Sequence, residues 1–337
     1  HGDDDAYDGG TPMRLGEQIL DEVFRAMQID AEWSIREPNR FTWWGHRLAQ
    51  RVVADDPVTD DGFSITRVRA ETDFLKDVPA TPDVTEKVAL LNAMATMNAL
   101  VWEPERRTIS LACAVYAHAE TVRFAAHLLK GAVAIQAADA HLKVDGLAEL
   151  FHAQPNSSHH PRSGPRREPD DMLNAIAMFA RSGQGISPYG PDVDGIVRMV
   201  QANRILVTET RLGMTAEFGF TDETPAVLGG RGTSLFNLEA MTPHPQVGSG
   251  ALMTLSLPSS WPRAEAAEIA SKLNRAEASG REFVRAHLLG GWCVAASDGS
   301  VTYAAFLPAQ FRGAGLLQNI VASIAVRSRW AGQYLAG

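Results

Sequence analysis

The residues His118, Glu120 and His127 have types and a spacing that would suit metal chemistry. Two imidazoles and a carboxylate form a ligand set that zinc accepts. Neither an HExxH pattern nor a paired-cysteine motif accompanies them. We therefore interpret residues 118–127 as a polar corner between a strand and a helix, and we predict no metal and no other cofactor.

Two glycine-bearing stretches resemble catalytic or phosphate-binding loops. A phosphate loop needs a helix start and usually a lysine, but residues 228–234 (LGGRGTS) lead into Leu235, Phe236 and Leu238, which read as a strand. Residues 248–250 (GSG) lack the glycine spacing of a nucleophile elbow, although His244 lies five residues before Ser249. We interpret both stretches as hairpin loops and predict no catalytic residues.

Charged side chains cluster at two further places. Glu71 and Asp73 share one face of a predicted strand, and paired carboxylates can perform acid–base chemistry. Alternate acidic residues on a strand are more typical of its solvated face. The basic residues Arg162, Arg166 and Arg167 are too few for a nucleic-acid site in an acidic protein.

The adjacent residues Trp43 and Trp44 are the strongest indication of binding. Side chains alternate along a strand, so these two rings must point to opposite faces of a sheet. One ring fills the core, and the other emerges where it either anchors a partner or is covered by the second half or the final helix. With Phe218 as a counterpart in the second half, we predict Trp43, Trp44 and Phe218 as protein-binding residues.

The first half of the chain alternates between helical and strand periodicity. Apolar residues repeat at helical spacing in residues 12–28, after the Thr11-Pro12 start signal, and again in residues 82–95. Strands are expected around the Pro38-Asn39 turn, at residues 63–73, and in a hairpin at residues 100–116 that opens with Trp102. A long helix begins at Thr121. The predicted order is α-β-β-β-α-β-β-α.

The same order is expected after a proline-rich segment. Strand-like stretches lie at 205–220, 233–240 and 251–257, a helix at 262–278, a hairpin that opens near Trp292, and a last helix from about 313. Leu91-Asn92 and Leu273-Asn274 recur in the two middle helices. We predict an α+β fold of two tandem repeats, with antiparallel sheets and helices packed on one face. The predicted parts are a disordered tail (1–11), a first domain (12–151), a linker (152–171) and a second domain (172–337).

Composition narrows the class of protein further. The 337 residues are enough for two domains, and a net charge of −9 opposes binding to nucleic acid or to an anionic membrane. The two cysteines, Cys113 and Cys293, are expected to be reduced and buried. No apolar run is long enough for a membrane span, and the N-terminal residues do not read as a signal peptide. These features favour a cytoplasmic protein.

Two segments carry a family resemblance. "ALLNAMATMNALVWEPERRTISLACAVY" (89–116) and, more weakly, "KLNRAEASGREFVRAHLLGGWCVAASDGSVTYAAFLP" (272–308) resemble the superfamily that joins type III secretion chaperones with YbjN-like proteins. The resemblance implies two tandem copies that bind a polypeptide client on exposed sheet or helix surfaces, without catalysis. It also implies a homodimer, or a monomer whose two halves form an internal pseudo-dimer. The alternatives are an enzyme with a site between the halves and a structural subunit of a larger assembly.

Overall fold

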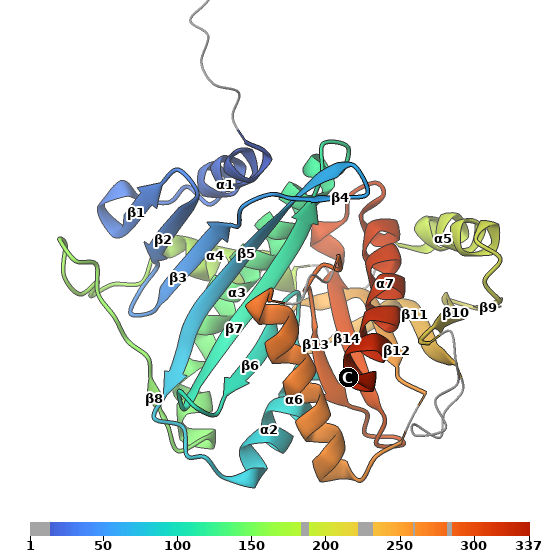
Figure 1. The fold of residues 1–337 in the computed structure, drawn as a ribbon. Helices are drawn as coiled ribbons and strands as arrows, with labels where there is room; N and C mark the ends of the chain where they lie inside the picture. Colours follow the sequence, from blue (N-terminus) through green and yellow to red (C-terminus); the bar gives the residue numbers. More distant parts are fainter. Residues whose placement is uncertain (1–13, 183–188, 222–231, 259, 282–284) are drawn as a thin grey trace, which may run out of the picture.

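The computed structural model describes residues 14–182, 189–221, 232–258, 260–281 and 285–337. It contains α-helices and two antiparallel sheets, which confirms the predicted α+β class (Figure 1). The predicted tail of residues 1–11 lies outside the described residues. No helix within the described ranges is long and apolar enough to cross a membrane.

The first sheet and its helices are formed by residues 15–155. In chain order these elements are α1 (Leu15–Ala26), the 3-10 turn η1 (Ala31–Trp33), β1 (Ser34–Glu37), β2 (Arg40–Trp44), β3 (Ala49–Ala54), β4 (Val58–Asp60), β5 (Phe63–Lys76), α2 (Pro82–Asn92), β6 (Ala99–Glu103), β7 (Thr108–Ala117), α3 (Val122–Leu150) and β8 (Gln154–Pro155).

The second sheet and its helices follow. These elements are α4 (Asp171–Arg181), α5 (Gly190–Ala202), β9 (Val207–Thr210), β10 (Gly213–Gly219), β11 (Thr233–His244), β12 (Gly248–Ser256), α6 (Arg263–Ser279), β13 (Gly291–Val294), β14 (Val301–Pro308), the 3-10 turn η2 (Ala309–Phe311) and α7 (Leu316–Ala336).

The two antiparallel sheets have corresponding strand orders. The first sheet has the order β1-β2-β3-β5-β7-β6, with β4 and β8 paired to β5, and the second has β9-β10-β11-β12-β14-β13. The prediction of three strands before each middle helix was wrong. A turn at residues 45–48 separates β2 from β3, and a turn at residues 211–212 divides the predicted strand 205–220 into β9 and β10.

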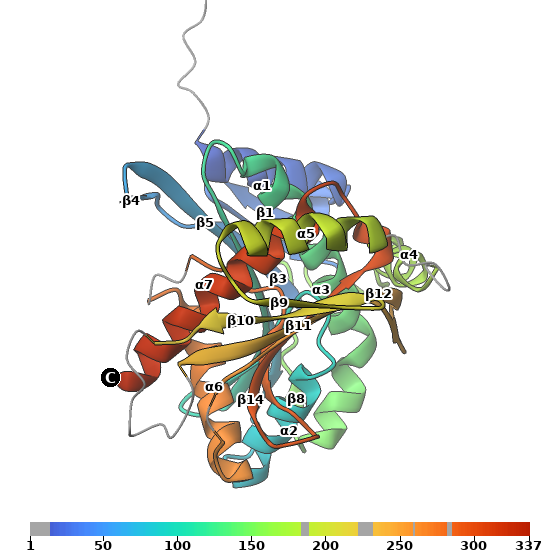
Figure 2. The same ribbon diagram turned by 90° about the vertical axis from the view of Figure 1, so that its right-hand side faces the viewer.

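The two faces of the first sheet have different covers. The long helix α3 lies against the inner face (Figure 1). There, Gln50 of β3 donates a hydrogen bond to the Val133 carbonyl at 3.0 Å. On the outer face, α6 of the second half packs over β6 and β7, where Ala99 and Ala112 form a cross-strand pair of small side chains. In the second half, α5 and α7 pack together over the second sheet (Figure 2).

Two asparagines fasten the middle helices to the strands that follow them. The Asn92 amide accepts from the Leu100 N–H (2.8 Å) and donates to the Leu100 carbonyl (2.9 Å). Asn274 makes the same two bonds with Trp292, both at 2.8 Å. The recurring Leu-Asn pair in the sequence therefore corresponds to a recurring contact. By this contact Trp292 matches Leu100, and not the other hairpin-opening tryptophan, Trp102.

Backbone hydrogen bonds join the two halves. Ala114 in β7 and Leu288, three residues before β13, exchange two of them, at 3.0 and 2.8 Å. Two residues along β7, the Tyr116 N–H donates to Nδ1 of His287 at 3.1 Å. A short segment of the second half thus continues the first sheet beyond the end of β6.

Arg67 of the first half binds the C-terminal end of α6. It donates to the Glu277 and Ala278 carbonyls at 2.9 and 2.8 Å, and a cation at this end of a helix is favoured by the helix dipole. Gly280 ends α6 with φ +64°, and a Cβ at that position would lie 2.0 Å from the Arg67 guanidinium. Glycine is therefore required here both for its backbone conformation and for space.

A buried ion pair lies next to this junction. Arg327 of α7 is fully buried and donates to both Glu277 carboxylate oxygens at 2.9–3.2 Å. Its guanidinium also lies 3.7 Å from the Tyr303 ring centre, and the Trp292 indole N–H donates to Glu277 at 2.7 Å. Burial lowers the pKa of Arg327, but the Glu277 carboxylate and the other contacts outweigh burial and raise the pKa above its usual value.

The predicted linker is packed against the first half. β8 pairs with β5, and the Asp170 N–H donates to the Gly45 carbonyl at 2.8 Å. The following helix, α4, packs on α3 through Leu173, which contacts Trp43 and Gly45 at the inner face of the first sheet. By its contacts, α4 belongs with the first half, although the sequence boundary at residue 172 assigned it to the second.

The two cysteines are free thiols, as predicted. Cys113 and Cys293 are both buried and form no disulfide. Burial raises the pKa of each thiol to about 12, so neither is a reactive thiolate at neutral pH.

Candidate functional site

The predicted protein-binding residues are buried. Trp43, Trp44 and Phe218 are 1%, 7% and 2% exposed. Phe218 stacks on Phe236 beneath α7, with ring centres 5.0 Å apart. Burial of one tryptophan in the core was expected, but neither Trp44 nor Phe218 lies on an exposed sheet face in this structure.

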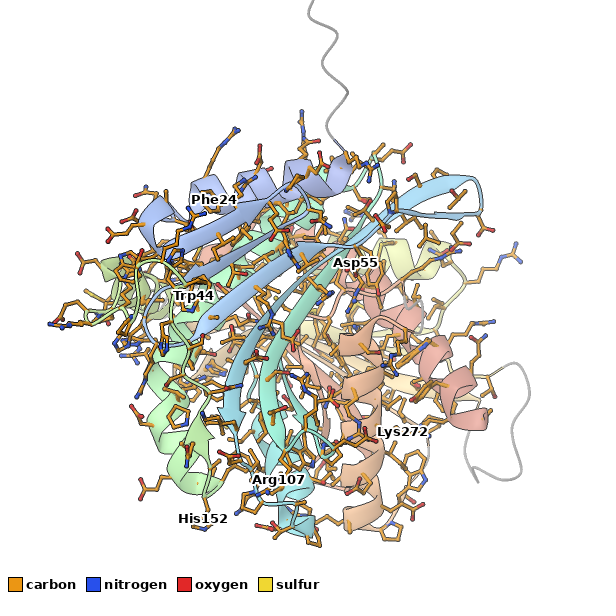
Figure 3. All side chains as sticks on the ribbon, turned by 60° about the vertical axis from the view of Figure 1, so that its left-hand side comes forward. Phe24, Trp44, Asp55, Arg107, His152 and Lys272 are labelled. Carbon is orange, nitrogen blue, oxygen red and sulfur yellow. The ribbon has the colours of Figure 1, made fainter. Side chains whose placement is uncertain are left out.

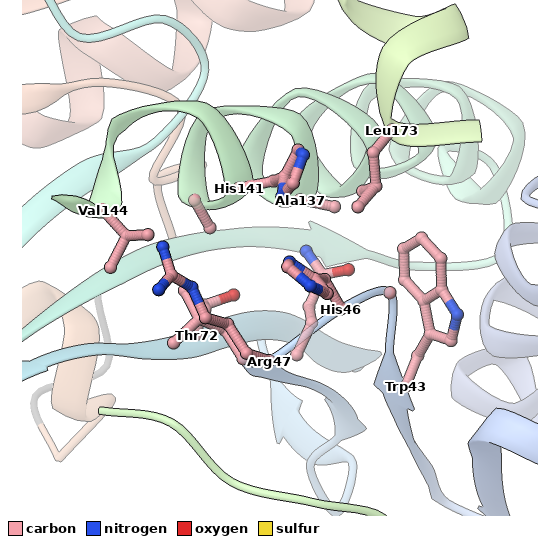
Figure 4. Close-up of a pocket in the computed structure, with 12 residues that line it drawn as sticks. Trp43, His46, Arg47, Thr72, Ala137, His141, Val144 and Leu173 are labelled. Carbon is pink, nitrogen blue, oxygen red and sulfur yellow. The ribbon is translucent and has the colours of Figure 1, made fainter. Parts of the chain in front are cut away.

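Trp43 faces inward and forms one wall of a small pocket. The pocket is lined by His46, His141 and Leu173 among others, and its cavity volume of about 20 Å³ holds about one water molecule (Figure 4). Burial, with the neighbouring His46 and Arg47, lowers the pKa of His141. The pocket is too small for a substrate, so it is part of the packing around α3.

Trp44 faces outward and is covered by the linker. Trp44 lies at one end of β2 in the first sheet (Figure 3). Its indole N–H donates to the Ser158 hydroxyl at 3.0 Å, and its carbonyl accepts from Arg166 at 2.9 Å. The His160 ring lies edge-on to the indole, with centres 5.2 Å apart. The alternating geometry predicted for the tryptophan pair is present, but the cover is neither the second half nor the final helix.

Replacing Trp44 with serine is expected to lower stability by about 2 kcal/mol, because the ring loses its packing under the linker. The expected fall in melting temperature is roughly 2–4 °C per kcal/mol. In Trp44→Phe a six-membered aromatic ring stays, while the pyrrole part of the indole and its bond to Ser158 are lost, so the cost should be smaller, about 1 kcal/mol. Thermal melts of the parent and the two variants test whether the melting temperature falls further in Trp44→Ser than in Trp44→Phe. Equal melting temperatures for Trp44→Ser and the parent would contradict the prediction.

The charged face of the first sheet is a network of ion pairs. Arg51 binds Asp73 through two hydrogen bonds of 2.7 and 2.9 Å, and Glu71 lies 3.7 Å from the same guanidinium. Arg69 pairs with Asp55 at 3.1 Å on the same strand face. Glu71 and Asp73 thus serve as ion-pair partners on a solvated face, in agreement with the sequence interpretation.

The predicted polar corner is folded as a helix start. The Thr121 hydroxyl accepts the His118 N–H at 3.1 Å, and His118 Nδ1 accepts the Glu120 N–H at 3.3 Å. Across the described residues, no group of three or more His, Cys, Asp or Glu side chains is arranged to hold a metal ion. Residues 228–231 of the glycine stretch lie outside the described residues, and β11 begins at Thr233.

A cleft of about 460 Å³ lies between the two halves, where the enzyme hypothesis would place its chemistry. It is lined by Tyr116, His118 and Thr121 of the first half and by Arg285, His287 and Ser323 of the second, among others. Burial, and then Arg327, lower the pKa of His287 to about 4, so this imidazole is neutral. Its Nδ1 accepts the Tyr116 backbone N–H across the junction of the halves, and its backbone N–H donates to the Ser323 hydroxyl at 2.7 Å within the second half. His287 is therefore held in place by the packing of this junction.

A different hollow, here called the helix groove, lies between α2 and α3. Its volume is about 300 Å³, and it continues into a hollow of about 180 Å³ beside α4 with which it shares Asp139, Lys143 and Gln246. The apolar lining residues are Phe74, Leu91, Met94, Leu100, Leu111 and Leu147 in the first part and Ile135, Leu142, Ile176 and Val247 in the second.

The helix groove has exposed apolar residues at its rim. Met94, just beyond α2, is 54% exposed, and Leu142 on α3 is 50% exposed. Asp139 and Lys143 neutralise each other at 2.9 Å. Sequence analysis did not identify this groove, but α3 carries leucines on more than one face, which is a signal of a second apolar contact.

The second half supports the rim of the helix groove through His244. Its Nδ1 accepts the Gln246 N–H at 3.2 Å, so Nε2 carries the proton and donates to the Met94 carbonyl at 3.1 Å. The ring packs on Phe306, with centres 4.8 Å apart. His244 therefore positions Met94, a role unlike the serine activation considered from the sequence.

Comparison of the chain with protein-family models, with curated protein sequences and with solved structures gave no significant match.

Proposed function

We propose that this protein is a non-catalytic, chaperone-like binding module that holds an apolar segment of another protein in the helix groove. The observation that carries the proposal is the apolar lining of the helix groove and of the hollow that continues it, with Met94 exposed at the rim of the first and Leu142 at the rim of the second. Singly exposed apolar residues are ordinary, but apolar residues gathered around a hollow are typical of binding sites.

The occupant that fits best is an amphipathic helix. The walls of the groove offer few polar groups to the backbone of an extended peptide, whereas a helix satisfies its own backbone hydrogen bonds. Its apolar side chains at positions i, i+3 or i+4, and i+7 would enter the groove.

The proposal includes a monomer in which the halves form an internal pseudo-dimer. Three observations support it: the corresponding strand orders of the two sheets, the matched contacts of Asn92 and Asn274, and the packing of α2 on α6. It also includes a cytoplasmic location, supported by two unpaired cysteines. The resemblance to type III secretion chaperones and YbjN-like proteins is consistent with this function.

The test is a display screen of helical peptides of about 15 residues against the intact protein. We expect enrichment of peptides with helically spaced aliphatic residues. Met94→Glu and Leu142→Glu should each weaken their binding by about 2 kcal/mol, a factor of roughly 30, because a charge replaces an apolar contact. Leu206→Glu is a matched control, since Leu206 is 72% exposed and lies away from the groove.

The proposal fails if folded Met94→Glu and Leu142→Glu proteins bind the selected peptides as tightly as the parent. It also fails if Leu206→Glu weakens binding by the same factor, because the effect would then come from added charge alone.

A further inference from the structure

The linker occupies an aromatic surface in the manner of a bound peptide. This surface, here called the tryptophan surface, consists of Trp33, Trp44 and the turn of residues 45–47. Residues 156–170 (NSSHHPRSGPRREPD) lie across it, and they carry three prolines and no aliphatic side chain. A segment of this composition has little apolar area of its own with which to offset the entropy of ordering. The energy that orders it must therefore come from the surface beneath.

The contacts are those expected between a peptide and its receptor. Backbone groups of the segment bind backbone groups of the turn: the Ser158 N–H donates to the Arg47 carbonyl at 2.9 Å and the Asp170 N–H to the Gly45 carbonyl at 2.8 Å. Between these two points the Ser163 hydroxyl donates to the Glu32 carbonyl at 2.8 Å. The segment is held along its whole length.

The side chains that fit the tryptophan surface are a histidine and an arginine. His160 is 5% exposed and lies edge-on to both Trp44 and Trp33, with ring centres 5.2 and 6.5 Å away. The Arg166 guanidinium lies 5.3 Å from the Trp33 ring centre while it donates to the Trp44 carbonyl. Cation–π contact and aromatic packing recognise side-chain type, so the surface is selective.

We propose that the tryptophan surface is a binding site for proline-rich, arginine-bearing segments of other proteins, and that residues 156–170 are its built-in competitor. Aromatic-lined grooves are a common receptor for proline-rich peptides. A tethered segment has an effective concentration in the millimolar range. A partner segment therefore binds only when its affinity and concentration together outcompete the linker, or when the linker has been displaced. The site is separate from the helix groove and does not depend on it.

The test uses the full chain with residues 156–168 replaced by glycine and serine at equal length, and a synthetic peptide of residues 154–170. We expect saturable binding of the peptide to this chain, read by tryptophan fluorescence and calorimetry. The intact parent should bind at least tenfold more weakly because its own linker competes. Trp44→Ala in the replaced chain, or Arg166→Ala in the peptide, should each weaken binding at least tenfold.

The proposal is overturned if the replaced chain folds but does not bind the peptide. It is also overturned if the replaced chain binds the peptide equally well with and without Trp44→Ala. If the replaced chain does not fold, the intact chain carrying Arg166→Ala serves as the host. That host should bind the peptide more tightly than the parent, and no gain would overturn the proposal. Met94→Glu should leave this binding unchanged, which separates it from a failure at the helix groove.

Discussion

Replacing Arg327 with methionine is expected to destabilise the protein by about 3–5 kcal/mol, the usual cost of removing one partner of a buried ion pair. Glu277 is 3% exposed, and in the variant its carboxylate keeps the Trp292 N–H but loses its bidentate cation. The guanidinium contact with the Tyr303 ring is lost as well. Urea denaturation at neutral pH, monitored by circular dichroism, measures this change.

A double variant separates the unpaired charge from a simple packing defect. Arg327→Met/Glu277→Leu should recover much of the loss, because buried pairs replaced by apolar residues are often close to neutral in stability. A loss of the same size in the double variant would contradict the ion-pair explanation.

The fold class followed from the sequence because it depends on local periodicity. Helical spacing in residues 12–28 and 262–278 corresponds closely to α1 and α6, and alternation in residues 63–73 corresponds to β5. Strand number was harder to predict, because the short turn at residues 45–48 contains one glycine, Gly45, and no proline, which is a weak signal of a break between strands. The Leu-Asn repeat did carry information, since Asn92 and Asn274 make the same pair of bonds.

The features that the sequence did not predict all depend on contacts between distant residues. Arg327 and Glu277 are 50 residues apart, and neither position has a local signal of burial. The linker reads as disordered by composition, but its order depends on Trp33 and Trp44, more than 110 residues earlier. Met94 and Leu142 line adjoining hollows only after α2 and α3 pack on the same sheet.

The junction between the halves is expected to make stability sensitive to mild acid through His287. This imidazole is neutral in the folded state, because burial and Arg327 lower its pKa from 6.5 to about 4. In the unfolded chain it takes up a proton near its ordinary pKa, so the unfolded state binds more protons than the folded state between these two values. The stability from this group is therefore fully present above pH 6.5 and is lost as the pH falls toward 4.

Lowering the pH from 7 to 5 should cost roughly 2 kcal/mol through His287 alone. His287→Asn supplies the control, because an asparagine amide oxygen can occupy the position of Nδ1 and still accept the Tyr116 N–H, but it does not titrate. The variant should lose about 2 kcal/mol less than the parent over the same interval, whatever its stability at pH 7. Urea midpoints at the two pH values for both proteins give this difference directly. Parallel losses in parent and variant would show that acid acts on other groups and that the His287 contact between the halves is indifferent to pH.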